Sequence, residues 1–338
     1  MGRLSNLRLI DSEMRVGIIT PAPAGSNLGN RVTALRWAHL LKDLGHQVYV
    51  KQEYAGESFD LLVGLHARRS YESIKRFHED HPQRPLIVAL SGTDLYHDLP
   101  RSNRRAQQSL EFATRIVALQ PKAQEELEPR LRYKVRVIYQ SVSANLAKRT
   151  PRYRTTPARG KHSAFDVCVV GHLRPVKDPF RAALAARLLP RTSRIRIVHV
   201  GGAMTPAMEA RAIREMELNP RYRWIGDQPR ARTYAILARS NLCVLSSKME
   251  GGANVLSEAI VASVPIVASR IPGTVGILGD KYPGYFDVGM TRELAELMIQ
   301  AETDAAFLQG LLRRGRQLAD HFSPITERKA WVKLLNEL

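Results

Sequence analysis

Residues 246–258, with the sequence SSKMEGGANVLSE, could carry the most chemistry in this chain. They follow an apolar strand-like run at 242–245 and lead into an apolar run at 255–264 that is typical of a helix. A strand, a glycine-containing loop and a helix N-terminus form an anion site, because glycines allow close backbone approach and the first helical N–H groups face the ligand. Glu250 and Glu258 bracket the loop. Carboxylates there suit a ligand with hydroxyls as well as phosphates, as in a nucleotide sugar.

A second basic loop, GHLRPVKDP at 171–179, also lies between a predicted strand and a predicted helix. Arg174 and Lys177 are three residues apart in it, so both cationic ends can converge on a diphosphate. Arginine offers a bidentate contact and lysine a compact point charge. The alternative is a pair of solvated side chains. Together with Glu250 and Glu258, this loop favours a nucleotide-sugar site.

Three loops in the first half of the chain also follow predicted strands. The first, TPAPAGSNLGNR at 20–31, ends in Gly29, Asn30 and Arg31; Asn30 is expected to cap the next helix and Arg31 to face a ligand. The alternative is a plain turn between a strand and a helix. The other two loops are HARRS at 66–70 and SGTD at 91–94.

The side chains of these last two loops suit a small anionic ligand. A histidine and two arginines at a strand end can bind a tetrahedral oxyanion, because the arginine fork matches its geometry. The alternative is a charged helix start, which fits Arg69 better than His66 or Arg68. In the other loop Thr93 is a candidate ligand contact, and Asp94 either caps a helix or acts as a base or a contact to the acceptor.

Length and composition indicate a soluble protein of two domains. The chain has 338 residues, 44% apolar and 25% charged, and no run approaches the roughly 20 apolar residues of a membrane span. The first 15 residues lack the apolar stretch of a secretory signal, and Cys168 and Cys243 lie in apolar strand-like runs that indicate buried thiols. We therefore expect a cytoplasmic protein. The net charge of +19 is dispersed, and neither zinc-finger spacing nor an RNP-like strand accompanies it.

Apolar runs alternate with amphipathic segments along the chain, which is typical of parallel sheets covered by helices on both faces. Strands are predicted at 16–20, 47–50, 61–63, 86–90, 115–119, 135–138, 166–170, 195–200, 222–225, 242–245, 265–268 and 284–288. Helices are predicted at 30–44, 70–80, 106–113, 122–131, 179–189, 206–218, 230–239, 255–264, 291–321 with a break near 303, and 323–338. Residues 148–161 contain six Lys or Arg and no acid, and are expected to be an exposed linker. The expected fold is therefore α/β, with two doubly wound, Rossmann-like domains facing across a cleft.

The loop at 171–177 and the Glu-x7-Glu element at 250–258 resemble those of GT-B glycosyltransferases of the family 4 type. The resemblance implies an acceptor domain at 14–148, joined by a C-terminal helix at 323–338 that crosses back to it, and a nucleotide-sugar domain at 162–320. It assigns the donor diphosphate to Arg174 and Lys177, the ribose to Glu258, and the donor sugar to Glu250 as a catalytic residue. It adds backbone donor contacts at Gly171, Gly201, Gly226, Gly252, Asn254 and Val255. There is no Asp-x-Asp, so no metal is expected, and no cofactor.

The N-terminal loops are most similar to a narrower group, the selenosugar synthases of selenoneine biosynthesis. That resemblance implies transfer of glucose or N-acetylglucosamine from a UDP-sugar to selenophosphate, with a carbon–selenium bond formed and a selenophosphate synthetase supplying the acceptor. It assigns acceptor binding to Gly29, Asn30, Arg31, Arg68, Arg69 and Thr93, and catalysis to His66 and Asp94 beside Glu250.

Three alternatives stay open. A conventional family 4 enzyme would use a hydroxyl acceptor. A UDP-sugar 2-epimerase shares the GT-B fold but needs more carboxylates and histidines than these loops supply. A basic RNA-binding module would show salt-sensitive binding to nucleic acid, and the donor motif argues against it. We therefore expect no nucleic-acid partner.

Overall fold

The structure is a computed structural model that describes residues 13–26, 28–143 and 164–338. By its internal contacts the chain divides into two compact units. Unit 1 comprises Met1–Gln140 and Ile325–Leu338, and unit 2 comprises Ser141–Pro324. The predicted linker at 148–161 lies outside the described residues. In the described part of the chain, no helix has both the length and the apolar character needed to cross a bilayer.

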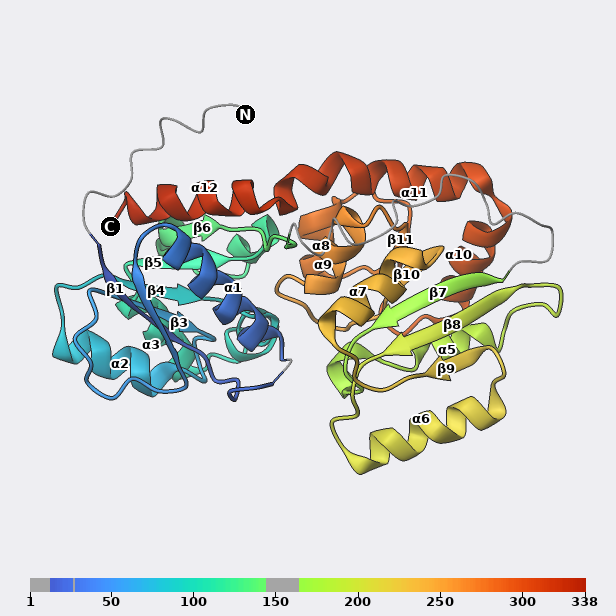
Figure 1. Cartoon of the computed structure of the whole chain (residues 1–338), viewed down its shortest axis with the longest axis horizontal. Coiled ribbons are helices and arrows are strands. Elements are labelled where there is room, and N and C mark those ends of the chain that lie inside the picture. Colours follow the sequence, from blue (N-terminus) through green and yellow to red (C-terminus); the bar gives the residue numbers. More distant parts are fainter. Residues whose placement is uncertain (1–12, 27, 144–163) are drawn as a thin grey trace. The chain divides into compact units, whose positions relative to one another are not determined.

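Unit 1 is built on a six-stranded parallel sheet in the order β2-β1-β3-β4-β5-β6 (Figure 1). Its strands are β1 (Arg15–Ile19), β2 (Gln47–Lys51), β3 (Leu61–Leu65), β4 (Leu86–Ala89), β5 (Arg115–Ala118) and β6 (Val135–Val137). Its α-helices are α1 (Gly29–Asp43), α2 (Tyr71–Asp80), α3 (Arg104–Phe112) and, from the end of the chain, α12 (Pro324–Leu335). The strands are short and β3 and β4 are buried throughout, as expected of a parallel sheet covered on both faces.

The helices of unit 1 pack on both faces of this sheet. One apolar cluster joins α2 and α3 to the sheet through Phe77 and Leu110. The other joins α1 and α12 through Trp37 and Trp331, whose rings meet edge to face at 5.0 Å. The buried Glu327 accepts a hydrogen bond of 2.8 Å from Trp37 Nε1, so α12 is fixed to α1 by a polar contact as well as by apolar packing.

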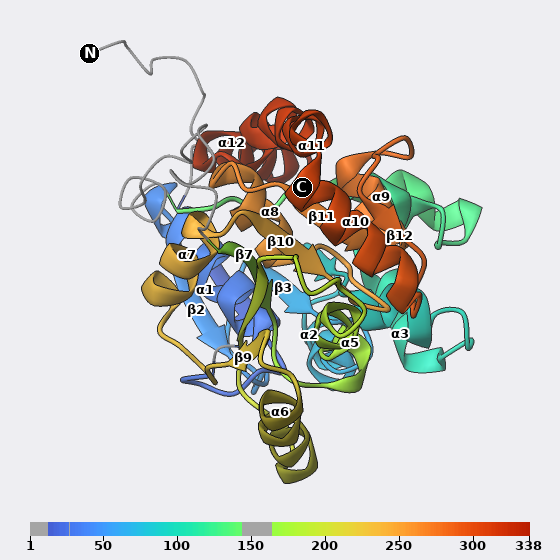
Figure 2. The ribbon, with the colours of Figure 1, turned by 90° about the vertical axis from the view of Figure 1, so that its right-hand side faces the viewer.

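Unit 2 is built on a second six-stranded parallel sheet in the order β12-β11-β10-β7-β8-β9. Its strands are β7 (Phe165–Val170), β8 (Ile195–Val200), β9 (Tyr222–Trp224), β10 (Leu242–Leu245), β11 (Ile266–Ser269) and β12 (Tyr285–Phe286). Its α-helices are α5 (Arg181–Ala186), α6 (Pro206–Leu218), α7 (Arg230–Arg239), α8 (Asn254–Val261), α9 (Pro272–Leu278), α10 (Thr291–Thr303) and α11 (Ala305–Leu318). Both views place α6 beside the edge strand β9 (Figures 1 and 2).

Each sheet has one point at which the strand order reverses. In unit 1 the reversal lies between β1 and β3, and in unit 2 between β7 and β10. Ligands of doubly wound sheets bind beyond the carboxyl ends of the strands at such points. The loops that follow these four strands are among those that the sequence analysis singled out, so the predicted doubly wound architecture positions them where ligands bind.

One predicted helix and one predicted helix cap were wrong, and one helix was missed. The helix expected at 122–131 is instead two 3-10 turns, Pro121–Gln124 and Pro129–Lys134. Pro129 lacks an N–H and disfavours helical backbone at the residue before it, which explains the interruption. Helix α1 begins at Gly29 with Leu28 as its N-cap, so Asn30 does not cap it. Helix α9 was missed because Pro272 and Gly273 open it and have the composition of a loop. The predicted break near 303 is confirmed, since Asp304 caps α11 there.

Candidate active site

In unit 2 the loops after β7 and β10 are joined by side-chain and backbone contacts. The Lys177 ammonium forms an ion pair with the Glu250 carboxylate, and both side chains are largely buried. The Lys248 N–H donates to Val176 O at 2.8 Å, and the Ser246 hydroxyl donates to Asp178 O at 2.9 Å. Two of the predicted site residues, Lys177 and Glu250, are therefore held together at the reversal of strand order.

Glu250 has a rigid environment. The buried Ser247 hydroxyl donates to its carboxylate at 2.5 Å, and Ser269 at the end of β11 donates to Ser247 O at 2.5 Å. A side chain on Gly273 would overlap the Glu250 carbonyl, so α9 approaches this loop closely only because that position is glycine. The carboxylate is thus positioned by three neighbouring elements before any ligand binds.

Arg174 lies on the exposed side of the same loop, as the residue that precedes the 3-10 turn Pro175–Lys177. Among the described residues no hydrogen bond or ion pair engages its guanidinium. Lys177 lies in the same turn and is already paired with Glu250. The structure therefore places one free cation and one paired cation in the loop that was predicted to bind a diphosphate.

The loops after β8 and β9 approach the first loop very closely. Gly201 has φ +147° and donates to Gly226 O at 2.8 Å, and a side chain at Gly201 would overlap the carbonyl of Gly171. The Trp224 indole donates to Gly201 O at 2.7 Å. Three of the predicted donor-binding glycines therefore lie at adjacent strand ends, and at Gly201 only glycine fits.

A buried histidine, which the sequence analysis missed, supports these loops. His199 donates from Nε2 to Gly171 O at 3.0 Å and accepts from the Tyr222 hydroxyl at Nδ1, at 2.9 Å. Burial lowers the pKa of His199 to about 4, only partly opposed by the hydrogen bond to Gly171 O, so the imidazole is neutral at pH 7. It fixes the carbonyl of Gly171 at the start of the predicted diphosphate loop.

Helix α8 carries the remaining predicted donor contacts. Gly252 precedes it, and Asn254, Val255 and Glu258 lie in its first turns. The buried Glu258 carboxylate accepts from Arg230 at 3.1 Å, and Arg230 is the first residue of α7. The sequence analysis did not single out Arg230, because nothing in its local sequence links it to α8.

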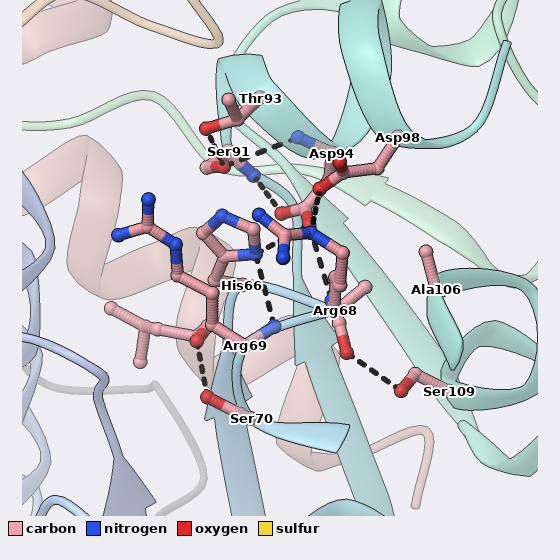
Figure 3. A network of polar contacts seen from close by, with 12 residues as sticks. His66, Arg68, Arg69, Ser70, Ser91, Thr93, Asp94, Asp98, Ala106 and Ser109 are labelled. Carbon is pink, nitrogen blue, oxygen red and sulfur yellow. Dashed lines mark hydrogen bonds and ion pairs between the residues drawn. The ribbon is translucent and has the colours of Figure 1, made fainter. Parts of the chain in front are cut away.

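In unit 1 the loop after β3 brings His66 against Asp94 (Figure 3). His66 Nδ1 lies 2.6 Å from Asp94 Oδ1, and both side chains are buried. The Asp94 carboxylate also accepts from the N–H groups of Ser91 at 2.9 Å and Arg68 at 3.3 Å. Asp94 does not cap a helix; it is the first residue of a π-helical turn, Asp94–Asp98, and its side chain connects two loops. His66 has φ +75°, an uncommon conformation for a residue with a side chain.

Arg68 is held by a second buried carboxylate, Asp98. Arg68 Nε donates to Asp98 Oδ2 at 2.8 Å, and His97 Nδ1 lies 3.0 Å from Asp98 Oδ1. Burial acts to raise the pKa of Asp98, but hydrogen bonds from Arg68 and His97 outweigh it and hold the pKa below its usual range. The contact through Nε leaves the two terminal nitrogens of the fork for other partners. The sequence did not indicate Asp98, which lies 30 residues from Arg68.

The other predicted acceptor residues are less closely tied to this group. Arg69 is exposed, and the Thr93 hydroxyl lies 3.3 Å from that of Ser91 (Figure 3). Gly29, Asn30 and Arg31 form the first turn of α1, and Arg31 Nε is buried without a hydrogen-bond partner among the described residues. The structure brings His66, Asp94 and Arg68 together.

The ligand atoms of His66, Asp94 and Asp98 lie within 4.8 Å of one another, close enough to hold a metal ion. The two carboxylates already have partners, because Asp98 accepts from Arg68 and Asp94 accepts from His66 and two backbone N–H groups. A metal would have to displace the Arg68 guanidinium. We therefore interpret the cluster as a hydrogen-bonded support for His66 and Arg68.

Most of unit 2 matches a known protein family. Residues 157–317 match the family described as glycosyl transferases group 1. The chain contains a glycosyltransferase domain. The structure is also similar over 96% of the chain to HepE from Anabaena in complex with UDP and glucose, with TM-score 0.73, 17% identity and 100% of that chain covered.

Two further structures are similar over 96% of this glycosyltransferase. Sucrose-phosphate synthase from Thermosynechococcus elongatus has TM-score 0.72, 16% identity and 99% of its chain covered. A glycosyltransferase from Rickettsia africae has TM-score 0.71, 12% identity and 98% covered. Such likenesses confirm the predicted GT-B fold. The family match covers the loops of Lys177, Glu250 and Glu258, and the protein is accordingly an enzyme of the glycosyltransferase class.

Proposed function

We propose that this glycosyltransferase transfers a hexose from a UDP-sugar to selenophosphate. The observation that carries the proposal is the set of cationic and polar groups after β3, in which His66 and Arg68 are held in place by buried carboxylates and Arg69 is exposed beside them. Such a set suits a small tetrahedral oxyanion, because the arginine fork matches its oxygens. A neutral hydroxyl acceptor has no need of two arginines.

The donor assignment is supported by the contacts in unit 2. A ribose needs a fixed carboxylate, and Glu258 is buried and held by Arg230. A diphosphate needs cations, and Arg174 and Lys177 supply two in one loop. HepE, of the same fold, is known in complex with UDP and glucose. Glucose and N-acetylglucosamine both remain candidates for the sugar.

In the proposed reaction the acceptor attacks without a base, and the enzyme stabilises the leaving group. Selenophosphate is already anionic, so its selenium needs no base to attack the anomeric carbon. The leaving UDP gains negative charge on its diphosphate, and Arg174 and Lys177 would stabilise that charge. Glu250 would contact the donor sugar. Catalysis of the transfer then rests on positioning and on stabilisation of the leaving group.

The acceptor assignment is tested by steady-state kinetics of Arg68→Ala. We expect the KM for selenophosphate to rise by roughly 10- to 100-fold, since a charge-assisted hydrogen bond is lost, while the KM for the UDP-sugar changes little. Arg105→Ala is the matched control, because Arg105 is exposed, pairs with Glu72 and lies over the ring of Tyr71. An equal rise in both KM values would reject the acceptor assignment.

One observation favours a second candidate function. A hydroxyl acceptor must lose its proton, and a histidine fixed by a carboxylate, as His66 is by Asp94, is a general base of the usual kind. A family 4 enzyme with a sugar or polyol acceptor would use that pair. It would release UDP with the hydroxyl compound in the absence of selenophosphate.

A further inference from the structure

Helix α7 begins with charges that a helix N-terminus disfavours. Its first turn contains Arg230 and Arg232 and no acidic residue, and Pro229, which precedes it, has no side chain that can cap the free N–H groups. Because the N-terminus of a helix carries a partial positive charge, two arginines there oppose the dipole. Local rules of this kind are broken most often at functional sites. The contacts of Arg230 indicate such a role.

Arg230 pairs with the buried carboxylate of Glu258. Its Nη2 donates to Glu258 Oε1 at 3.1 Å, and the side chain of Glu258 is only 11% exposed. An ionised carboxylate is costly to bury unless a cation and hydrogen bonds accompany it. Arg230 therefore compensates the charge of Glu258 and restricts the rotation of its carboxylate.

The geometry of this pair is compatible with a further partner for Glu258. Arg230 uses one terminal nitrogen rather than the bidentate fork, and its side chain stays 41% exposed. A carboxylate has two oxygens and about four sites at which it can accept hydrogen bonds, so Glu258 can accept from Arg230 and from two hydroxyls together. Arg230 can thus orient the carboxylate without being displaced when a ligand binds.

The ion pair connects two loops of the predicted donor site. Arg230 directly follows residues 226–229, the loop after β9, and Glu258 lies four residues beyond the start of α8, which follows the loop after β10. Gly226 is also tied to the loop after β8, because its carbonyl accepts from the Gly201 N–H at 2.8 Å. The contact therefore fixes Glu258 relative to the loops that border it.

We propose that Arg230 is a positioning residue for the donor nucleotide and holds Glu258 in the orientation that selects intact ribose hydroxyls. This inference rests on the proposed function, in which the donor is a UDP-sugar and Glu258 contacts its ribose. Two neighbouring hydroxyls match the two oxygens of a fixed carboxylate. A carboxylate that is free to rotate binds them less tightly, because that freedom is lost on binding. Arg230 acts through Glu258, so its removal should affect ribose recognition specifically.

The test is calorimetry with UDP and with 2′,3′-dideoxy-UDP, which lacks both ribose hydroxyls. The wild-type enzyme should bind UDP more tightly. In Arg230→Ala the affinity for UDP should fall by roughly 10-fold, as expected when a hydrogen bond to a buried charged group is lost, and the ratio of the two affinities should approach 1. Arg230→Lys should restore most of that ratio, because a single contact does not need the guanidinium fork.

Arg232→Ala is the matched control. Arg232 is exposed in the same turn of α7, so its substitution removes the same charge from the helix N-terminus while the Arg230–Glu258 pair stays in place. Its affinity for UDP should stay within about twofold of the wild type. A fall equal to that of Arg230→Ala would overturn the inference, because the cause would then be the charge on the helix.

A double variant separates positioning from direct contact. If Arg230 acts through Glu258, Arg230→Ala combined with Glu258→Ala should bind UDP no more weakly than Glu258→Ala alone. Losses that multiply would overturn the inference, since Arg230 would then contribute independently of Glu258. Cooperative thermal unfolding checks each variant, and Arg230→Gln, which keeps a polar side chain without the charge, replaces the alanine variant if that variant is unfolded.

These outcomes differ from those that test the acceptor. An enzyme with the predicted change in ribose preference that forms no selenium-containing product would overturn the acceptor part of the proposed function and support this inference. A wild-type ribose preference that persists in Arg230→Ala would overturn this inference and leave the proposed function intact.

Discussion

Lys177 and Glu250 form a largely buried ion pair that joins the loop after β7 to the loop after β10. Each side chain was predicted to contact the donor, the lysine through its diphosphate and the glutamate through its sugar. Because they already contact each other, their positions are set before the donor binds. Removal of one partner leaves the other buried and unpaired, which is costly.

Lys177→Ala should therefore lower kcat with a UDP-sugar by about 10²- to 10³-fold, since it removes charge stabilisation from the leaving diphosphate and frees Glu250. Lys248→Ala is the matched control, because Lys248 is exposed in the adjoining loop and its hydrogen bond to Val176 is made by the backbone N–H, which the substitution keeps. Steady-state UDP release checks both variants. Near-normal turnover in Lys177→Ala would remove it from the diphosphate site.

Glu258→Ala should weaken UDP affinity by roughly 10- to 100-fold if its carboxylate accepts hydrogen bonds from the ribose. Calorimetry with UDP and 2′-deoxy-UDP makes the assignment specific. The wild-type enzyme should bind the deoxy compound less tightly, and the variant should bind both alike. A variant that still discriminates between them would show that another residue contacts that hydroxyl.

Gly201→Ala should destabilise unit 2 and abolish UDP binding. The backbone at φ +147° costs a residue with a side chain about 1–3 kcal/mol, and the added carbon would overlap the Gly171 carbonyl. Gly310→Ala in α11 is the contrasting variant: its surroundings are open, and it should stabilise the protein by about 0.5–1 kcal/mol. Chemical denaturation measures both. Equal stability of the two variants would contradict this account of Gly201.

His199 should make the stability of unit 2 pH-dependent. Its pKa is lowered from 6.5 to about 4 in the folded protein, so the unfolded chain binds the proton more tightly. The stabilisation is fully present above pH 6.5 and decreases as the pH falls toward 4, by roughly 3 kcal/mol in all. The free energy of unfolding of the wild type and of His199→Gln should be compared between pH 7 and 4.5. Identical pH slopes would contradict the assignment.

Much of the architecture follows from local sequence. Short apolar runs predicted the strands, and Ser323-Pro324 predicted the start of the last helix, because these signals act within one turn or one strand. The helix predicted at 122–131 was wrong for an equally local reason, because Pro129 interrupts it. Helix α1 begins at Gly29, one residue before the predicted start at Asn30, and the residue types there did not indicate this.

The partners of the site residues could not be predicted in the same way. His66 and Asp94 are 28 residues apart and meet because β3 and β4 are neighbours, as the register pair Gly64 and Val88 shows. Arg68 and Asp98, and Arg230 and Glu258, likewise come from different elements of the fold. Sequence spacing identified the loops, but which side chains pair across them depends on strand order and on side-chain direction.

The most direct test of the account is mass spectrometry of the purified protein with UDP-N-acetylglucosamine or UDP-glucose and selenophosphate generated in situ. The account predicts a hexose-containing product with the isotope pattern of selenium, formed in equal amount with UDP. UDP-sugar binding with no selenium-containing product would contradict it, and would leave a glycosyltransferase with a different acceptor.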